Sequence, residues 1–91
     1  MRNFTVYMEM YVDFTKNVQR KIRRYETQDI ICLLDILDMP VEGAKDEKDA
    51  LTTLKYRIQE SEHMFYLMIY EEVDNKLEHI FGESKEFKGT D

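Results

Sequence analysis

Hydrophobic and polar side chains alternate without interruption over residues 4–14. The apolar face consists of Phe4, Val6, Met8, Met10, Val12 and Phe14. The other face carries Thr5, Tyr7, Glu9, Tyr11 and Asp13. A two-residue period in aromatic and β-branched side chains is typical of a half-buried strand. A helix is the alternative, but its apolar side would leave out Val6, Met10, Val12 and Phe14, so we predict a strand.

The period changes after Phe14. Thr15 can cap a helix that runs to about Tyr25, with Val18 and Ile22 turned inward. Thr27 or Asp29 can cap a second helix, which is apolar on most sides through Leu37 and which Pro40 ends.

Residues 39–46 hold the only Pro and one of the three Gly of the chain, and they predict a loop. Asp46 then begins an acidic segment, which favours the start of a helix. Ala50, Leu54 and Ile58 continue at helical spacing.

Residues 63–73 allow two interpretations. Their Phe, Tyr and Ile favour a strand, whereas the absence of Gly and Pro between Ala44 and Phe81 favours one long helix ending at Gly82. We predict a strand, because a strand at 4–14 needs a partner for its backbone groups. A short helix over 75–81 and a loose polar tail over 82–91 follow.

Together these elements predict a small α+β fold. We expect a single compact domain over 1–81, in which the N-terminal strand pairs with the strand near 63–73 and three to four helices complete the fold. The alternative is an all-α helical bundle. The 91 residues are enough for one modest hydrophobic core.

Charge is divided unevenly along the chain. Residues 1–26 carry a net charge of +3, and the remainder carries −9. The basic residues gather in one short strip, made of Lys16, Arg20, Lys21, Arg23 and Arg24. On a helix, four of these residues would share one face, with Lys21 at its edge, and this face could bind phosphates. The alternative is a solvated face that pairs with acids such as Glu60, Glu62 or Glu71. Because no aromatic residues interleave the strip and no nucleic-acid-binding motif is present, direct nucleic-acid binding is the weaker hypothesis.

Carboxylates dominate the rest of the chain. The candidates for an acidic contact surface are Asp35, Asp38, Glu42, Asp46, Glu47, Asp49, Glu71, Glu72, Asp74 and Glu78. Spaced carboxylates can imitate the phosphates of DNA and block the nucleic-acid site of a basic DNA-binding protein. The alternative is that they serve only solubility.

Tyr7 and Tyr11 project together from the strand face opposite the core, with Glu9 between them. Exposed tyrosines are favoured contact residues at protein interfaces, so these three residues are candidates for partner binding. The alternative is that a helix covers this face. An unpaired edge of strand 4–14 could also join a second copy in a homodimer.

No residue pattern indicates catalysis, a metal or a cofactor. Glu60 and His63 form one Glu-x-x-His pair, but a dimetal site needs a second, and Lys76 occupies the matching position before His79. Cys32 lies in an apolar run, where a thiol is normally unreactive. We therefore expect a protein that is not an enzyme.

A lone cysteine favours a reducing compartment, and neither a signal peptide nor a membrane span is apparent, so we expect a cytoplasmic protein. We predict a non-enzymatic modulator that binds another protein as an inhibitor. The alternatives are the acidic DNA mimic and the direct nucleic-acid binder. In composition alone, the small, acidic, Met- and Tyr-rich chain resembles accessory proteins that phages encode, which would place it in the host cytoplasm.

Overall fold

A computed structural model describes residues 1–11 and 17–85 of the chain. Its four strands are β1 (Arg2–Tyr11), β2 (Val18–Thr27), β3 (Met64–Val73) and β4 (Lys76–Ser84). They form one antiparallel sheet in the order β2-β1-β3-β4. Two helices, α1 (Ile30–Ile36) and α2 (Glu47–Glu60), lie between β2 and β3 in the chain. The predicted α+β class and the pairing of the N-terminal strand with a strand near 63–73 are confirmed.

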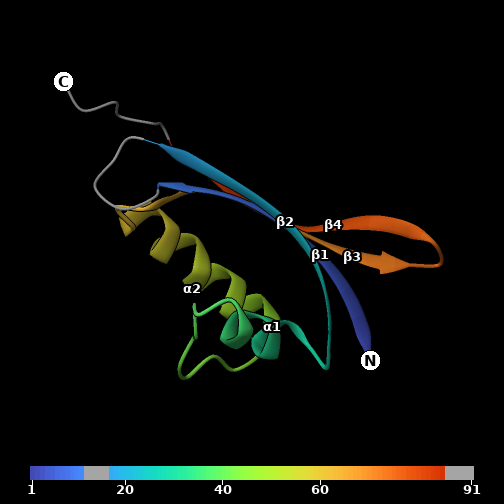
Figure 1. The fold of residues 1–91 in the computed structure, drawn as a ribbon. Helices are drawn as coiled ribbons and strands as arrows, with labels where there is room; N and C mark the ends of the chain where they lie inside the picture. The colour runs from blue at the N-terminus through green and yellow to red at the C-terminus, as the bar shows by residue number, and fades with distance from the viewer. Residues whose placement is uncertain (12–16, 86–91) are drawn as a thin grey trace.

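Both helices pack on the same face of the sheet, and the β3–β4 hairpin extends beyond them (Figure 1). The core forms between these layers from the inward positions of the strands and the apolar sides of the helices. Its fully buried large side chains are Phe4, Val6, Ile30, Leu33, Leu34, Leu54, Ile58, Leu67 and Ile69. The predicted alternation of residues 4–11 thus separates a buried face of β1 from an outer one; residues 12–14 of that predicted strand lie outside the described residues.

The helix predicted over 15–25 is wrong, because residues 18–27 form β2. This strand pairs with β1 in a register that places Tyr25 opposite Phe4 and Ile22 opposite Tyr7. The physical reason is that β1 lies inside the sheet, so its backbone groups need partners on both sides. The basic residues consequently alternate between two faces of a strand instead of sharing one face of a helix.

The short helix predicted over 75–81 is also wrong, because these residues belong to β4. Asp74 and Asn75 have φ values of 52° and 64°, and they connect a pair formed by Val73 and Lys76. Two left-handed residues between paired strand ends make a type I′ hairpin turn, which matches the twist of the strands. With two helices in the described chain, the expected count of three to four and the all-helical alternative are both wrong.

The helix starts and the loop predicted from the sequence are confirmed. The Asp29 carboxylate accepts a hydrogen bond from the Cys32 backbone N–H at 2.8 Å and caps α1. Asp46 caps α2 in the same way, accepting from the backbone N–H of Asp49 at 2.8 Å. Of the predicted tail 82–91, the first part belongs to β4, and residues 86–91 lie outside the described residues.

The sheet order also decides which strand edges are open. Because β1 pairs with β2 on one side and with β3 on the other, it has no free edge with which to recruit a second copy. That route to a homodimer is therefore wrong, and β2 and β4 are the edge strands. Among the described residues, neither helix has the length and apolar character needed to cross a membrane.

Candidate protein-binding surface

The face of the sheet turned away from α1 and α2 is the candidate site, and we call it the open face. Directly paired residues of an antiparallel sheet point to the same side, so the strand registers define its members. They include Thr5, Tyr7, Glu9, Tyr11, Val18, Arg20, Ile22, Arg24, Tyr66, Met68, Tyr70, Glu72, Leu77 and His79. No helix or strand within residues 1–11 and 17–85 covers this face (Figure 1).

Aromatic and aliphatic side chains fill the middle of the open face. The rings of Tyr7 and Tyr66 meet edge to face, with centroids 5.6 Å apart and planes at 88°. Tyr70 makes a similar contact with His79 at 5.5 Å. Ile22, directly opposite Tyr7, is 68% exposed, and Leu77, close to the turn between β3 and β4, is 57% exposed. A face that combines tyrosines with exposed large aliphatic side chains is typical of an interaction surface.

Gly82 allows the side chains of β3 and β4 to lie close together on the open face. A Cβ atom at this position would come within 2.6 Å of the Met68 Sδ atom and 2.7 Å of the His79 Nε2 atom. The missing side chain therefore leaves space for Met68 beside Tyr7, its partner across β1 and β3. A side chain here would displace the thioether and the imidazole ring.

Four charged groups of the open face form two ion pairs with one another. Glu9 accepts a hydrogen bond from the Tyr7 hydroxyl at 2.6 Å and one from Arg20 Nε at 3.2 Å. Arg24 donates to Glu72 at 2.6 Å. The hydrogen bond to Glu9, together with partial desolvation, raises the pKa of Tyr7, so the hydroxyl remains protonated and available as a donor. The face is therefore apolar at its centre and carries arginines whose charges are already balanced by glutamates.

The acids that form ion pairs with the basic strip are not the ones predicted from the sequence. Arg20 and Arg24 pair with Glu9 and Glu72, whereas Glu60 and Glu62 make no ion pair in the part of the chain that the structure describes. Lys21 and Arg23 point to the helix side, since they pair with Met8 and Val6. Lys16 lies outside the described residues. The five basic residues predicted as one strip are thus not a single surface.

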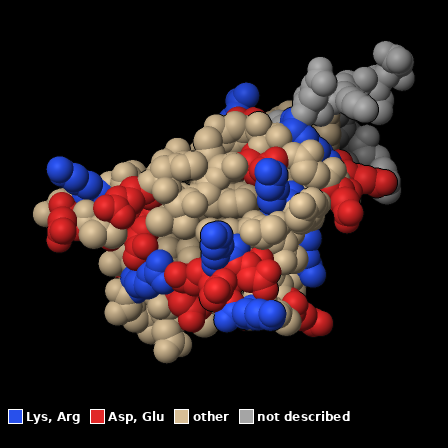
Figure 2. All heavy atoms as spheres, turned by 180° about the vertical axis from the view of Figure 1, so that it is seen from behind, with Lys and Arg blue, Asp and Glu red and all other residues tan. Residues whose placement is uncertain are grey.

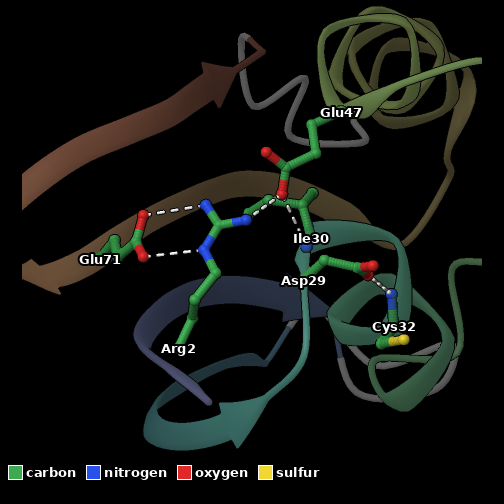
Figure 3. A network of polar contacts seen from close by, with 6 residues as sticks. All are labelled: Arg2, Asp29, Ile30, Cys32, Glu47 and Glu71. Atoms are coloured by element: carbon green, nitrogen blue, oxygen red, sulfur yellow. Dashed lines mark hydrogen bonds and ion pairs between the residues drawn. The ribbon is translucent and has the colours of Figure 1, made fainter.

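Glu47 and Glu71, both predicted as partner-binding residues, lie on the helix side in a network around Arg2 (Figure 3). The Arg2 guanidinium binds the Glu71 carboxylate through Nε at 2.8 Å and Nη2 at 2.9 Å. Its Nη1 atom donates to Glu47, which also accepts from the Ile30 backbone N–H at 3.1 Å. This network connects β1, β3 and the first turns of both helices. The role of these two carboxylates is therefore to stabilise the fold.

Beside this network, Asp29 lies next to the only cysteine (Figure 3). The hydrogen bond from the Cys32 backbone N–H holds the pKa of the Asp29 carboxyl below its usual value. The same carboxylate and partial burial raise the pKa of the Cys32 thiol. A thiol with a raised pKa is a poor nucleophile, so the geometry of this pair fits helix capping.

The remaining predicted acids do not join the tyrosines. Asp35 and Asp38 are exposed at the end of α1, Glu42 lies in the loop, and Asp46 and Asp49 form the start of α2. Asp74 lies in the hairpin turn. Glu78 lies directly opposite Glu71 in the register of β3 and β4, on the helix side of the sheet. On the side of the molecule seen in Figure 2, acidic groups lie directly beside basic ones instead of forming a separate acidic area.

Sequence reasoning selected Tyr7, Glu9 and Tyr11 and missed the other half of the open face. Tyr66, Met68 and Tyr70 alternate with buried residues in β3, and that period was visible in the sequence once a strand was assumed. Ile22 and Leu77 were missed because their segments were predicted as helices. Within the described chain, no group of three or more His, Cys, Asp and Glu side chains gathers as a metal site would require.

Comparison with known proteins finds no relative of this chain. No protein-family model matches the chain, and no curated protein and no solved structure matches it.

Proposed function

We propose that this chain is a non-enzymatic module that binds another protein through the open face and modulates it by covering part of its surface. The observation that carries the proposal is a sheet face with no covering layer among the described residues, which presents Tyr7, Tyr66 and Tyr70 together with the exposed side chains of Ile22 and Leu77. Tyrosine and large aliphatic side chains are the groups that bury most area at low entropic cost in protein interfaces.

The charge arrangement favours a protein over a nucleic acid as the partner. Arg20 and Arg24 are the arginines that the described chain places on the open face, and each already contacts a glutamate. A phosphate would have to compete with those carboxylates, and a nucleic acid would meet the repulsion of Glu9 and Glu72. An apolar protein surface requires no such exchange.

The DNA-mimic alternative has less support. A mimic needs a continuous line of carboxylates that are free to contact a basic protein. Here Glu9, Glu71 and Glu72 are bound to arginines of the same chain, and the other predicted acids are distributed over α1, the loop, α2 and the hairpin.

The proposal is tested by substitutions of exposed residues on the two faces of β2. Immobilised wild-type protein, an Ile22→Glu variant and a Gln19→Glu variant are used to capture proteins from a cell lysate, with a salt step before elution. Ile22 lies on the open face and Gln19 on the opposite side, yet both are exposed and both variants gain the same charge.

We expect a partner that resists the salt step and is lost with Ile22→Glu but retained with Gln19→Glu. Purified partner should then bind the Ile22→Glu variant at least about tenfold more weakly, which corresponds to about 1.4 kcal/mol. Equal binding of both variants would exclude the open face as the contact surface. A partner released by salt or by nuclease would favour the mimic or the nucleic-acid alternative instead.

A further inference from the structure

On the helix side of the sheet lies a second surface that no described element covers. Two adjoining pockets, with volumes of about 430 Å³ and about 220 Å³, share Met10 and Leu37 as lining residues. We call the combined feature the methionine groove, because Met8, Met10, Met39 and Met64 line it. It runs from β2, across β1, to the last turn of α2.

The groove exists because α1 is too short to cover β2. A helix of seven residues spans roughly 10 Å, whereas a strand of ten residues spans roughly 33 Å. Thr27, at one end of β2, is buried, and toward the other end Gln19 is exposed. Ile36, at the end of α1, is 55% exposed and lines the groove. The helix layer is thus incomplete over this half of the sheet.

Basic groups surround the apolar floor of the groove. Lys21 and Arg23 line it from β2, and Arg57 lines it from α2, together with His63. Lys21, Arg23 and Arg57 make no ion pair with any described residue, and Asp38 is the only acid among the described lining residues. This local excess of positive charge is notable in a chain with a net charge of −6.

We propose that the methionine groove binds an acidic amphipathic helix of a partner protein. A helix with its side chains is about 10–12 Å in diameter and would complete the layer that α1 leaves open. Its apolar side chains would contact the methionines, which adapt their shape to different partners. Its carboxylates would lie near Lys21, Arg23 and Arg57, where they gain attraction without displacing an existing ion pair of the described chain.

This surface is independent of the open face, since the two lie on opposite sides of the same sheet. A protein with both surfaces can hold two segments at once, either from one partner that wraps around the sheet or from two different partners. The inference therefore does not depend on the proposed function of the open face.

The test uses a synthetic fluorescein-labelled peptide of about 16 residues, a length at which an isolated helix is marginal. Leucines are placed at i, i+3, i+4 and i+7 and glutamates at most other positions. Binding to the full chain is measured by fluorescence anisotropy. A second peptide has the same composition in an order that destroys the helical period.

Two pairs of variants separate the groove from general charge effects. Arg57→Glu is matched by Lys55→Glu, a neighbouring position on α2 that does not line the groove. Ile36→Glu is matched by Tyr56→Glu, a large side chain that is 65% exposed and also lies outside the groove. We expect Arg57→Glu and Ile36→Glu each to weaken peptide binding about fivefold or more, whereas the two controls change it less than about twofold.

Several results would overturn the proposal. These are no binding of the periodic peptide up to about 1 mM, equal binding of the scrambled peptide, and equal effects of the groove variants and their controls. The open-face variant Ile22→Glu should bind the peptide as the wild type does. Loss of peptide binding in that variant would place the peptide on the open face and exclude the groove.

Discussion

Arg2 and Glu71, which are 69 positions apart in the chain, form a two-point ion pair across β1 and β3, with hydrogen bonds of 2.8 Å and 2.9 Å. The side chain of Glu71 is only 15% exposed, so its carboxylate depends on Arg2 for compensation of its charge. Because Arg2 also contacts Glu47 at the start of α2, this pair connects the sheet to the helix layer. The sheet and the helices should therefore lose stability together when it is broken.

Replacing Arg2 by glutamine should lower the free energy of unfolding by about 1–3 kcal/mol, since the largely buried carboxylate of Glu71 then loses its charged partner. Urea denaturation followed by circular dichroism measures this change. Arg24→Gln is the matched control, because it breaks an ion pair in which the arginine is 73% exposed. Its effect should stay below about 1 kcal/mol. Equal effects of both variants would contradict a special role for the Arg2 network.

The same ion pair predicts a pH dependence of stability. The hydrogen bonds from Arg2 hold the pKa of Glu71 below its ordinary value of 4.5. Since the folded-state pKa is lower than that of the unfolded chain, ionised Glu71 stabilises the fold above about pH 4.5, and this contribution is lost as the pH falls through the folded-state pKa. The stability difference between wild type and Glu71→Gln should thus be large near pH 7 and should decrease steadily as the pH falls below the ordinary pKa of 4.5. A difference that is independent of pH would show that the charge of Glu71 does not contribute.

Loss of the α1 cap should also be measurable. In Asp29→Ala the Cys32 backbone N–H loses the acceptor seen at 2.8 Å, and we expect a loss of about 1 kcal/mol. Asp35→Ala, at an exposed position inside the same helix, serves as the control and should be nearly neutral. Chemical denaturation of both variants tests this, and an equal loss in both would argue against capping.

The type I′ turn predicts opposite effects on stability for two substitutions of Asn75. Asn75 has a φ value of 64°, a conformation that glycine adopts freely and alanine does not. Asn75→Gly should therefore maintain or raise the melting temperature, whereas Asn75→Ala should lower stability by about 1 kcal/mol. Thermal unfolding of the two variants decides the point, and a more stable alanine variant would contradict the type I′ turn.

Gly82→Ala tests the close packing on the open face. The new Cβ atom would displace Met68 and His79, whose side-chain atoms lie 2.6 Å and 2.7 Å from its position. Both contacts involve flexible side chains, so we expect a change in stability below about 1 kcal/mol. The NMR signals of the Met68 methyl group and the His79 ring should shift clearly. Unchanged signals would mean that these side chains do not lie over Gly82.

The local sequence pattern was sufficient to predict part of this structure. The alternation of residues 4–11 predicted β1 and its outward tyrosines, because the two-residue period is a property of the strand itself. Thr27 or Asp29 was predicted to begin one helix and Asp46 the other, since a capping side chain bonds to a backbone N–H only a few positions away; the structure assigns the first cap to Asp29.

Tertiary contacts decided the rest. Val18, Ile22 and Tyr25 are spaced as in a helix, yet they form an edge strand because β1 requires a backbone partner on that side. The ion pair between Arg24 and Glu72 joins residues 48 positions apart, and it exists only because β2 and β3 both flank β1.

The sequence by itself therefore determined the α+β class, the outward position of Tyr7 and Tyr11, and the helix caps. Only the tertiary structure decided that these tyrosines share a face with Tyr66 and Tyr70, and that the four described residues of the basic strip divide between the open face and the methionine groove. The physical reason is the distance along the chain over which each interaction acts. Periodicity and capping act between neighbours in the chain, whereas strand order and register depend on the simultaneous packing of all elements.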